Sequence, residues 1–156
     1  MYVKRLVFAA ALLVATTAVP GHASGFGGYA AGNLNIRSGP STSFPAVGVL
    51  SAGTGLSVHG CLARYTWCDV SASGLRGWVS GAFIQTEYRE RRVFVPSNAR
   101  QVGVPVITFG FQSYWNDHYR DYDFYNDIDR WDEYHWQDDG PPPGWQDDWD
   151  YEDDEY

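Results

Sequence analysis

The sequence predicts an all-β fold: a small barrel with an extended C-terminal segment and an acidic, partly disordered tail. Three observations lead to this prediction. Apolar residues alternate with polar ones in short runs. Glycine-rich turns separate these runs, and no helical stripe of apolar residues occurs before residue 113. Short strands divided by such turns are typical of small barrels.

The first residues predict export. Lys4 and Arg5 give a positive start, residues 6–19 are an almost unbroken apolar run, and small residues lead to a cleavage site after Ala23. This order is typical of a secretory signal peptide. The apolar run is too short to span ~30 Å of hydrocarbon at about 1.5 Å per residue. We therefore predict a signal peptide at residues 1–23, no transmembrane segment after its removal, and a periplasmic or secreted protein.

The mature chain begins with a glycine-rich stretch, residues 24–32, which we predict to be a flexible lead. The first strand follows, because Leu34 and Ile36 alternate with Asn35 and Arg37. This period of two fits a half-buried strand, with Asn35 and Arg37 on the solvent side. The letters SGPS come next and predict a turn, since glycine permits positive φ and proline restricts its own φ.

Further strands follow at short intervals. Residues 47–49 and 56–58 repeat the two-residue period, and glycines separate them. Residues 65–70 return as the second arm of a hairpin, and the turn at 71–74 leads into a last strand at 75–79. These elements together predict a barrel over residues 33–86.

Two cysteines, Cys61 and Cys68, are the only ones in the chain. In an exported protein, thiols that meet across a hairpin are expected to oxidise. A zinc site needs about four ligands, and a nucleophilic cysteine needs a positioned base, for which His59 is the nearest candidate. We therefore predict a disulfide, which stabilises a barrel too small to bury a large core.

Three stretches resemble a known family when taken in this order: NLNIRSGPSTS, GCLARYTWCDV and GLRGWVSGAFIQ. Residues 33–85 resemble the bacterial SH3-like (SH3b) domain, a non-catalytic binding module of cell-envelope proteins. The resemblance implies an SH3-like barrel. It also implies a role in binding peptidoglycan or wall peptides through surface loops, or in targeting and interaction beside enzymes. No enzyme domain accompanies the module in this sequence.

Five residues are candidates for ligand binding: Asn35, Arg37, Tyr65, Trp67 and Trp78. Arg37 could hold a wall-peptide carboxylate through its planar fork of donors, or could be a solvated strand residue. Tyr65 and Trp67 lie near a hairpin tip, where an aromatic ring could stack on a sugar or peptide. For Trp67 and Trp78 the alternative is core packing, because large aromatic residues dominate small cores.

After the barrel, residues 87–112 are predicted to form an extended segment that packs on it. Two apolar runs, at 93–95 and 102–109, have an extended character, and Pro96 and Pro105 exclude them from a central strand. They therefore fit edge strands.

Charge is unevenly distributed in the mature chain. Residues 24–112 carry seven arginines against three acids, a net charge of +4, whereas residues 113–156 carry sixteen acids against two arginines, a net charge of −14. A protein that is acidic overall is a poor candidate for nucleic-acid binding, which depends on neutralising phosphates.

The tail, residues 113–156, mixes aromatic and acidic residues. Six apolar residues recur at spacings of three and four: Trp115, Tyr119, Tyr122, Tyr125, Ile128 and Trp131. This spacing fits one face of a helix, but aspartate is a poor helix former and like charges repel. Two readings stay open, a helical stripe and a disordered tail, and disorder is predicted for the last fifteen residues.

The tail does not fit a calcium loop. Counted from Asp121, an EF-hand would need glycine where Asn126 stands and glutamate where Asp132 stands. No metal or other cofactor is predicted. No nucleophile elbow or phosphate-binding loop occurs either, and a flexible acidic tail does not hold two carboxylates at a defined separation, so we predict no enzyme activity.

The sequence therefore predicts an exported, non-catalytic protein that binds peptidoglycan or wall peptides through its barrel. The alternative is an envelope protein–protein adaptor that acts through its aromatic and acidic tail. A third expectation concerns regulation. By charge complementarity, the acidic tail could cover Arg37, Arg89, Arg91 or Arg92 and limit access to the barrel, although exposed charge pairs are individually weak.

Overall fold

The computed structural model describes residues 25–146. The predicted signal peptide at residues 1–23 lies outside the described residues, and so do residues 147–156 of the predicted disordered end. Within the described range, none of the helices combines the length and the apolar character that a membrane crossing requires.

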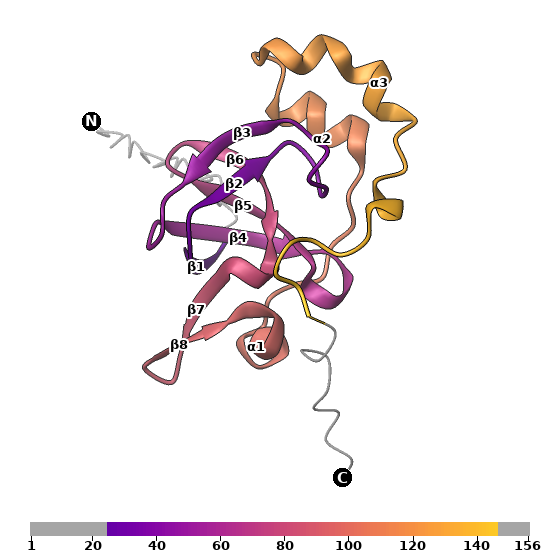
Figure 1. Ribbon diagram of the computed structural model, residues 1–156. Coiled ribbons are helices and arrows are strands. Elements are labelled where there is room, and N and C mark those ends of the chain that lie inside the picture. The colour runs from indigo at the N-terminus through magenta and orange to yellow at the C-terminus, as the bar shows by residue number, and fades with distance from the viewer. Residues whose placement is uncertain (1–24, 147–156) are drawn as a thin grey trace, which may run out of the picture.

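Eight strands form one sheet in which every neighbouring pair is antiparallel. The sheet curls into a half-barrel, with β3 and β8 at its two edges and the order β3-β2-β6-β5-β4-β1-β7-β8 (Figure 1). The strands are β1 Phe26–Ala30, β2 Leu34–Arg37, β3 Ala46–Leu50, β4 Gly55–Cys61, β5 Trp67–Ala72, β6 Leu75–Ser80, β7 Ile84–Tyr88 and β8 Arg91–Phe94.

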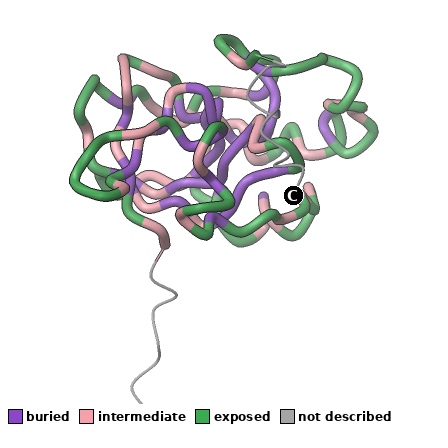
Figure 2. The backbone as a smooth tube through the Cα atoms, turned by 90° about the horizontal axis from the view of Figure 1, so that it is seen from below, coloured by how far each residue is buried: buried purple, intermediate pink, exposed green. Residues whose placement is uncertain are grey.

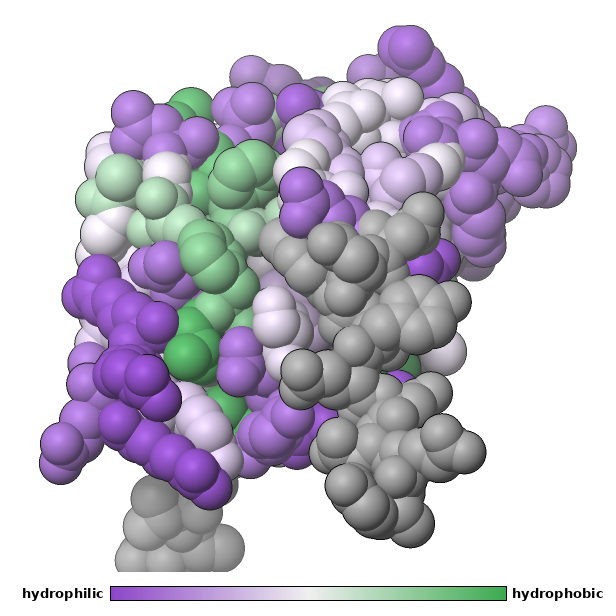
Figure 3. Space-filling model, turned by 60° about the horizontal axis from the view of Figure 1, so that its bottom comes forward, coloured by the Kyte–Doolittle hydropathy of each residue, from purple (hydrophilic) through white to green (hydrophobic). Residues whose placement is uncertain are grey.

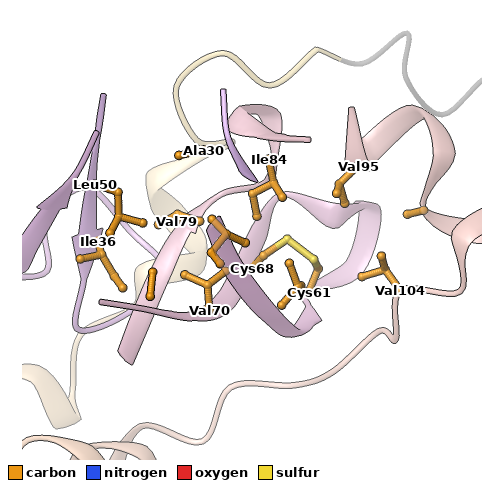
Figure 4. Packing of buried hydrophobic residues seen from close by; sticks show 14 residues of the cluster. Ala30, Ile36, Leu50, Cys61, Cys68, Val70, Val79, Ile84, Val95 and Val104 are labelled. Carbon is orange, nitrogen blue, oxygen red and sulfur yellow. A yellow bond between two sulfur atoms is a disulfide. The ribbon is translucent and has the colours of Figure 1, made fainter. Parts of the chain in front are cut away.

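The predicted alternation places side chains as expected along most strands. Ile36, Leu56 and Val58 are buried inside the curl, because a period of two directs alternate residues to one face of a sheet. Val49 on the edge strand β3 is an exception, with 66 % of its surface exposed. The buried residues on the inner face of the sheet make one apolar cluster with Val95 and Val104 from the segment after it (Figure 4), whereas Trp67 and Trp78 belong to a separate cluster.

The disulfide between Cys61 and Cys68 is present. The two residues face each other directly across β4 and β5, and both are fully buried in the apolar cluster (Figure 4). The bond closes a loop with a sequence separation of 7, which contains the short 3₁₀ helix η1, Ala63–Tyr65.

The glycine-rich lead does not match its expectation, because residues 26–30 form β1 between β4 and β7. Backbone pairing on both sides offsets the low strand propensity of glycine. Gly28 also allows close packing, since a Cβ atom there would lie 3.0 Å from the backbone oxygen of Gln85. A stretch whose glycine content suggested a flexible chain therefore forms a strand of the sheet.

The all-β class needs correction, because helices follow the strands. Residues 91–94 of the predicted extended segment form the edge strand β8, but the next residues form helix α1, Val95–Val102. Pro96 lies in the first turn of α1, where its missing N–H costs nothing. After α1 the chain is extended and bonds to the end of β4, with the N–H of Cys61 donating to the carbonyl of Pro105 at 2.9 Å.

The tail is also folded along its described part. It contains two α-helices and two 3₁₀ helices, and the apolar stripe is divided among several of these elements rather than carried by one helix. The remaining elements are η2 Gly81–Phe83, α2 Phe111–His118, η3 Asp123–Asp127, α3 Ile128–Asp132 and η4 Trp136–Asp139.

Aromatic packing explains why an acidic segment adopts this structure. Trp115, Tyr119 and Trp131 are buried with Phe44 of the barrel in a second cluster, and the indole N–H of Trp115 donates to the carbonyl of Ser38 at 3.1 Å. The acidic residues of the described tail are exposed, and Figure 2 shows how exposed stretches of the whole chain lie outside the buried ones. Burial of large rings therefore outweighs poor helix propensity and charge repulsion.

Candidate binding groove

The outer face of the β5–β6 hairpin carries the side chains that bear on function. Trp67 pairs with Ser80 and Asp69 pairs with Trp78 across the two strands. The residues between them, such as Cys68 and Val79, point into the buried core. Because facing residues of an antiparallel pair lie on the same side, Trp67, Asp69, Trp78 and Ser80 share the face opposite the core.

A groove of about 170 Å³ lies at one end of this face. It brings together β2, the beginning of β5, the end of β6 and one residue of the tail. Its lining residues are Asn33, Leu34, Asn35, Arg37, Thr42, Trp67, Ser80, Phe83 and Pro143. We call it the Trp67 groove.

A second hollow of about 340 Å³ adjoins the groove, and Trp67 lines both. Its other lining residues are Pro40, Arg64, Thr66, Trp136, Gln137, Gly140, Pro141 and Trp145. Tail residues thus contribute to the walls of both hollows.

Three of the five predicted binding residues line the groove: Asn35, Arg37 and Trp67. Asn35 is exposed on β2. The Arg37 guanidinium is half-buried, and its Nη1 donates to the backbone carbonyl of Phe44 at 2.8 Å. Partial burial lowers the pKa of Arg37 from its ordinary value. One N–H donor of Arg37 is therefore used within the barrel, and its other donors are available at the groove.

The other predicted aromatic residues are placed differently. Trp78 is 1 % exposed and packs against Phe109 and Tyr114, with ring centroids at 5.2 and 5.6 Å. Its indole N–H has no hydrogen-bond partner among the described residues. Tyr65 is half-buried at the hairpin tip and packs against the core cluster. Neither residue lines the Trp67 groove.

A closed polar network lies at the middle of the outer face. Asp69 is 4 % exposed and accepts two hydrogen bonds from Arg76, from Nε at 2.7 Å and from Nη2 at 2.6 Å. The Tyr114 hydroxyl of α2 also donates to Asp69 at 2.5 Å, and that of Tyr119 donates to the carbonyl of Arg76 at 3.0 Å. These contacts join the tail to the barrel.

Burial is the main reason why the pKa values of Tyr114 and Tyr119 lie well above that of a free tyrosine. Both phenols therefore remain protonated donors at neutral pH. The network satisfies its members internally, so it is a structural joint rather than a ligand site.

Sequence reasoning did not identify Thr42, Ser80, Phe83 or Pro143 as groove residues. Ser80 could have been predicted, because it lies two residues after Trp78 on one strand and therefore on the same face. Pro143 had none, since its contact with the groove spans 63 positions of sequence.

A wider cleft of about 930 Å³ lies on another part of the sheet and contains none of the five predicted residues. It is lined by β1, β4, the turn between β5 and β6, β7 and His118. Beside it, strongly hydrophilic residues gather over the β7–β8 hairpin, at the lower left of Figure 3. They include the exposed Arg89, Arg91 and Arg92.

Comparison with known proteins agrees with this architecture. Residues 32–85 match the family described as the bacterial SH3 domain, whose members are typically non-catalytic binding modules with roles that are commonly related to the cell wall. No curated protein and no solved structure matches the chain. The disulfide is consistent with an envelope or extracellular location. Residues 32–85 of this chain therefore match the bacterial SH3 domain, and β1 precedes the matched residues while β8, α1 and the folded tail follow them.

Proposed function

We propose that the protein is an exported, non-catalytic binding protein of the bacterial cell envelope that recognises peptidoglycan or its peptide stems through its SH3 domain. The observation that carries this proposal is the family match over residues 32–85. The Trp67 groove supports it, because three residues selected from sequence, Asn35, Arg37 and Trp67, line one depression.

The chemistry of the groove suits a short peptide attached to sugars. Trp67 lines the groove with the 6 % of its surface that is exposed and gives apolar groups a small contact. The Asn35 amide both donates and accepts hydrogen bonds. Arg37 holds Phe44 with one nitrogen, and its fork has further donors that fit a carboxylate of a stem peptide. A groove with one charged group and two aromatic rings gives modest affinity, which suits a polymer that offers many copies of its ligand.

Export belongs to the same proposal. Residues 1–23 fit a signal peptide with cleavage after Ala23, and the buried disulfide fits an oxidising compartment. Detection of the mature protein in a periplasmic or culture-medium fraction, with Ser24 at its N-terminus, tests this part.

Co-sedimentation of the mature chain with purified peptidoglycan tests binding. We expect the wild-type protein to pellet, and Asn35→Ala to weaken binding about fivefold, the equivalent of about 1 kcal/mol for one hydrogen bond. Asn126→Ala is the matched control, because Asn126 is exposed on the tail and outside the groove. A wild-type protein that stays in the supernatant at saturating peptidoglycan contradicts the proposal.

The alternative function, a protein–protein adaptor that works through the tail, stays a prediction. In the described part of the tail, the large rings of Trp115, Tyr119 and Trp131 are buried against the barrel. An adaptor would therefore use the half-buried rings, such as that of Tyr125, or the exposed carboxylates, such as those of Asp121 and Asp129. Its partner would be basic, and its binding would weaken with salt.

A further inference from the structure

A proline-rich segment of the tail lies over the Trp67 groove. Residues 140–145, with the sequence GPPPGW, follow η4 and pass along the outer face of the SH3 domain. Gly140 and Gly144 have φ values of 74° and 77°, which few residues other than glycine adopt. Between them the chain makes a turn, which is closed by a hydrogen bond from the N–H of Trp145 to the carbonyl of Pro142 at 3.2 Å. We call residues 140–145 the strap.

Specific contacts hold the strap at both ends of the groove. The Ser80 hydroxyl donates to the carbonyl of Pro143 at 2.9 Å, and Pro142 is buried. Gly144 packs so closely on the ring of Phe83 that a Cβ atom would lie 2.9 Å from it. Immediately before the strap, Asp139 accepts a hydrogen bond from the Ser41 hydroxyl.

Trp145 fastens the end of the strap to the hairpin tip. Its indole N–H donates to the carbonyl of Arg64 at 3.2 Å. The guanidinium of Arg64 lies 4.2 Å from the centre of the Trp145 ring, within the range of a cation–π contact. A ring and a proline-rich backbone, rather than carboxylates facing arginines, therefore make the described contacts across this site.

The position of the strap bears directly on access to the groove. Pro143 is one wall of the Trp67 groove, and Gly140, Pro141 and Trp145 line the hollow on the other side of Trp67. The strap therefore passes over the ring that both hollows share. A ligand that reached Trp67 and Ser80 fully would need the place that Pro143 occupies.

We propose that the strap is an intramolecular ligand of the Trp67 groove, and that an external peptide binds fully only by displacing it. This inference rests on the proposed function, because it describes regulation of the same site. The strap also indicates which ligand the groove accepts: a peptide backbone in a turn that offers a carbonyl to Ser80 and an apolar ring or methyl group to Phe83 and Trp67.

The strap is held by contacts that are individually modest. One neutral hydrogen bond and one exposed cation–π contact each contribute on the order of a fewfold to tenfold in an equilibrium constant. Because the apparent affinity of an external ligand is reduced by the fraction of open molecules, a closed strap should weaken external binding by at least about tenfold. No strap residue belongs to the apolar cluster of the sheet, so opening of the strap leaves that cluster in place and exposes the groove.

Variants of the full mature chain test this inference. Gly144→Ala should open the strap, because the added Cβ meets Phe83. Gly53→Ala is the matched control: Gly53 also has a positive φ, 81°, but a Cβ there meets nothing within 4 Å. Trp145→Ala is a second opening variant that removes the indole hydrogen bond and the contact with Arg64. Thermal unfolding of each variant verifies that the barrel is folded.

The probe is a fluorescent peptide with the sequence of residues 139–146, and fluorescence anisotropy measures its Kd. We expect both opening variants to bind it at least about tenfold more tightly than the wild type and Gly53→Ala. Adding Ser80→Ala to an opening variant should weaken this binding again. Equal affinities for all proteins, or no binding to any of them up to millimolar peptide, would overturn the proposal.

Peptidoglycan co-sedimentation of the same proteins separates this inference from the proposed function. Tighter peptide binding by the opening variants, with no protein in the peptidoglycan pellet, supports the strap and refutes wall binding. Equal pelleting of wild-type and opening variants, with unchanged peptide affinity, supports wall binding and refutes the strap.

Discussion

Tyr114→Phe is the sharpest test of the joint between the tail and the barrel. The Tyr114 hydroxyl of α2 donates to Asp69 of β5 at 2.5 Å, and Asp69 is 4 % exposed. The substitution removes this hydroxyl but keeps the ring that packs against Trp78. Asp69 keeps its two bonds from Arg76, so the variant isolates one hydrogen bond.

The expected loss follows from the charge of the acceptor. A hydrogen bond to a charged group contributes about 1.5–3 kcal/mol. Since Arg76 continues to compensate Asp69, we expect the free energy of unfolding to fall by about 2 kcal/mol. For a domain of this size, this corresponds to a decrease in Tm of about 7 °C.

Calorimetry or thermal circular dichroism measures the change, with Tyr88→Phe as the matched control. Tyr88 is half-buried on β7, no hydrogen bond of its hydroxyl is found among the described residues, and its ring contact with Arg89 survives the substitution. We expect its Tm to stay within about 1 °C of the wild type.

A double-mutant cycle makes the test specific to Asp69. In an Asp69→Asn background, Tyr114→Phe should cost less than in the wild type, with a coupling energy of about 1 kcal/mol. A wild-type Tm for Tyr114→Phe, or a coupling energy of zero, would show that the tail does not depend on this contact.

Three further predictions concern the barrel. Replacing both Cys61 and Cys68 by alanine should lower the free energy of unfolding by about 2–3 kcal/mol, the loop-closure contribution of so short a loop, and an unchanged denaturation midpoint would contradict this. Burial lowers the pKa of His59 below its ordinary 6.5, so the unfolded chain binds the proton more readily; stability should fall as the pH drops below about 6.5, and His59→Gln should flatten this pH profile of Tm. Gly77→Ala should cost about 1–3 kcal/mol, because its Cβ would lie 2.4 Å from a backbone oxygen of β2, whereas Gly27→Ala, with open space around it, should change the denaturation midpoint little.

Local pattern predicted the strands because their information is local. The alternation around Ile36 and Val58 requires only that one face of each strand be buried. The same pattern correctly predicted that the half-exposed Arg37 and the exposed Asn35 point away from the core. It failed for β1, because pairing with β4 and β7 stabilises a glycine-rich strand that has no strong propensity of its own.

The tail shows the opposite limit. Its apolar residues, spaced three and four apart, include the aromatic residues that pack on the barrel. The sequence did not decide between a helix and a disordered tail, because aspartates disfavour a helix and no surface to receive the rings was evident. The partner surface is Phe44 and the outer face of β5–β6, which lie far from Trp115 and Trp131 in sequence. Charge composition suggested that carboxylates would cover arginines, whereas rings and prolines make the contacts across the groove.

The sequence by itself determined the strands of the SH3 domain, the cysteine pair and three residues of the groove, because each depends on alternation, turn chemistry or residue type within short stretches. Only the tertiary structure decided that β1 completes the sheet, that the described tail is folded, and that Pro143 stands against Ser80 in the groove. These features arise from contacts across as many as 98 positions, the separation of Ser41 and Asp139. Burial of rings and pairing of backbone groups across such distances can reverse the local preferences of the residues involved.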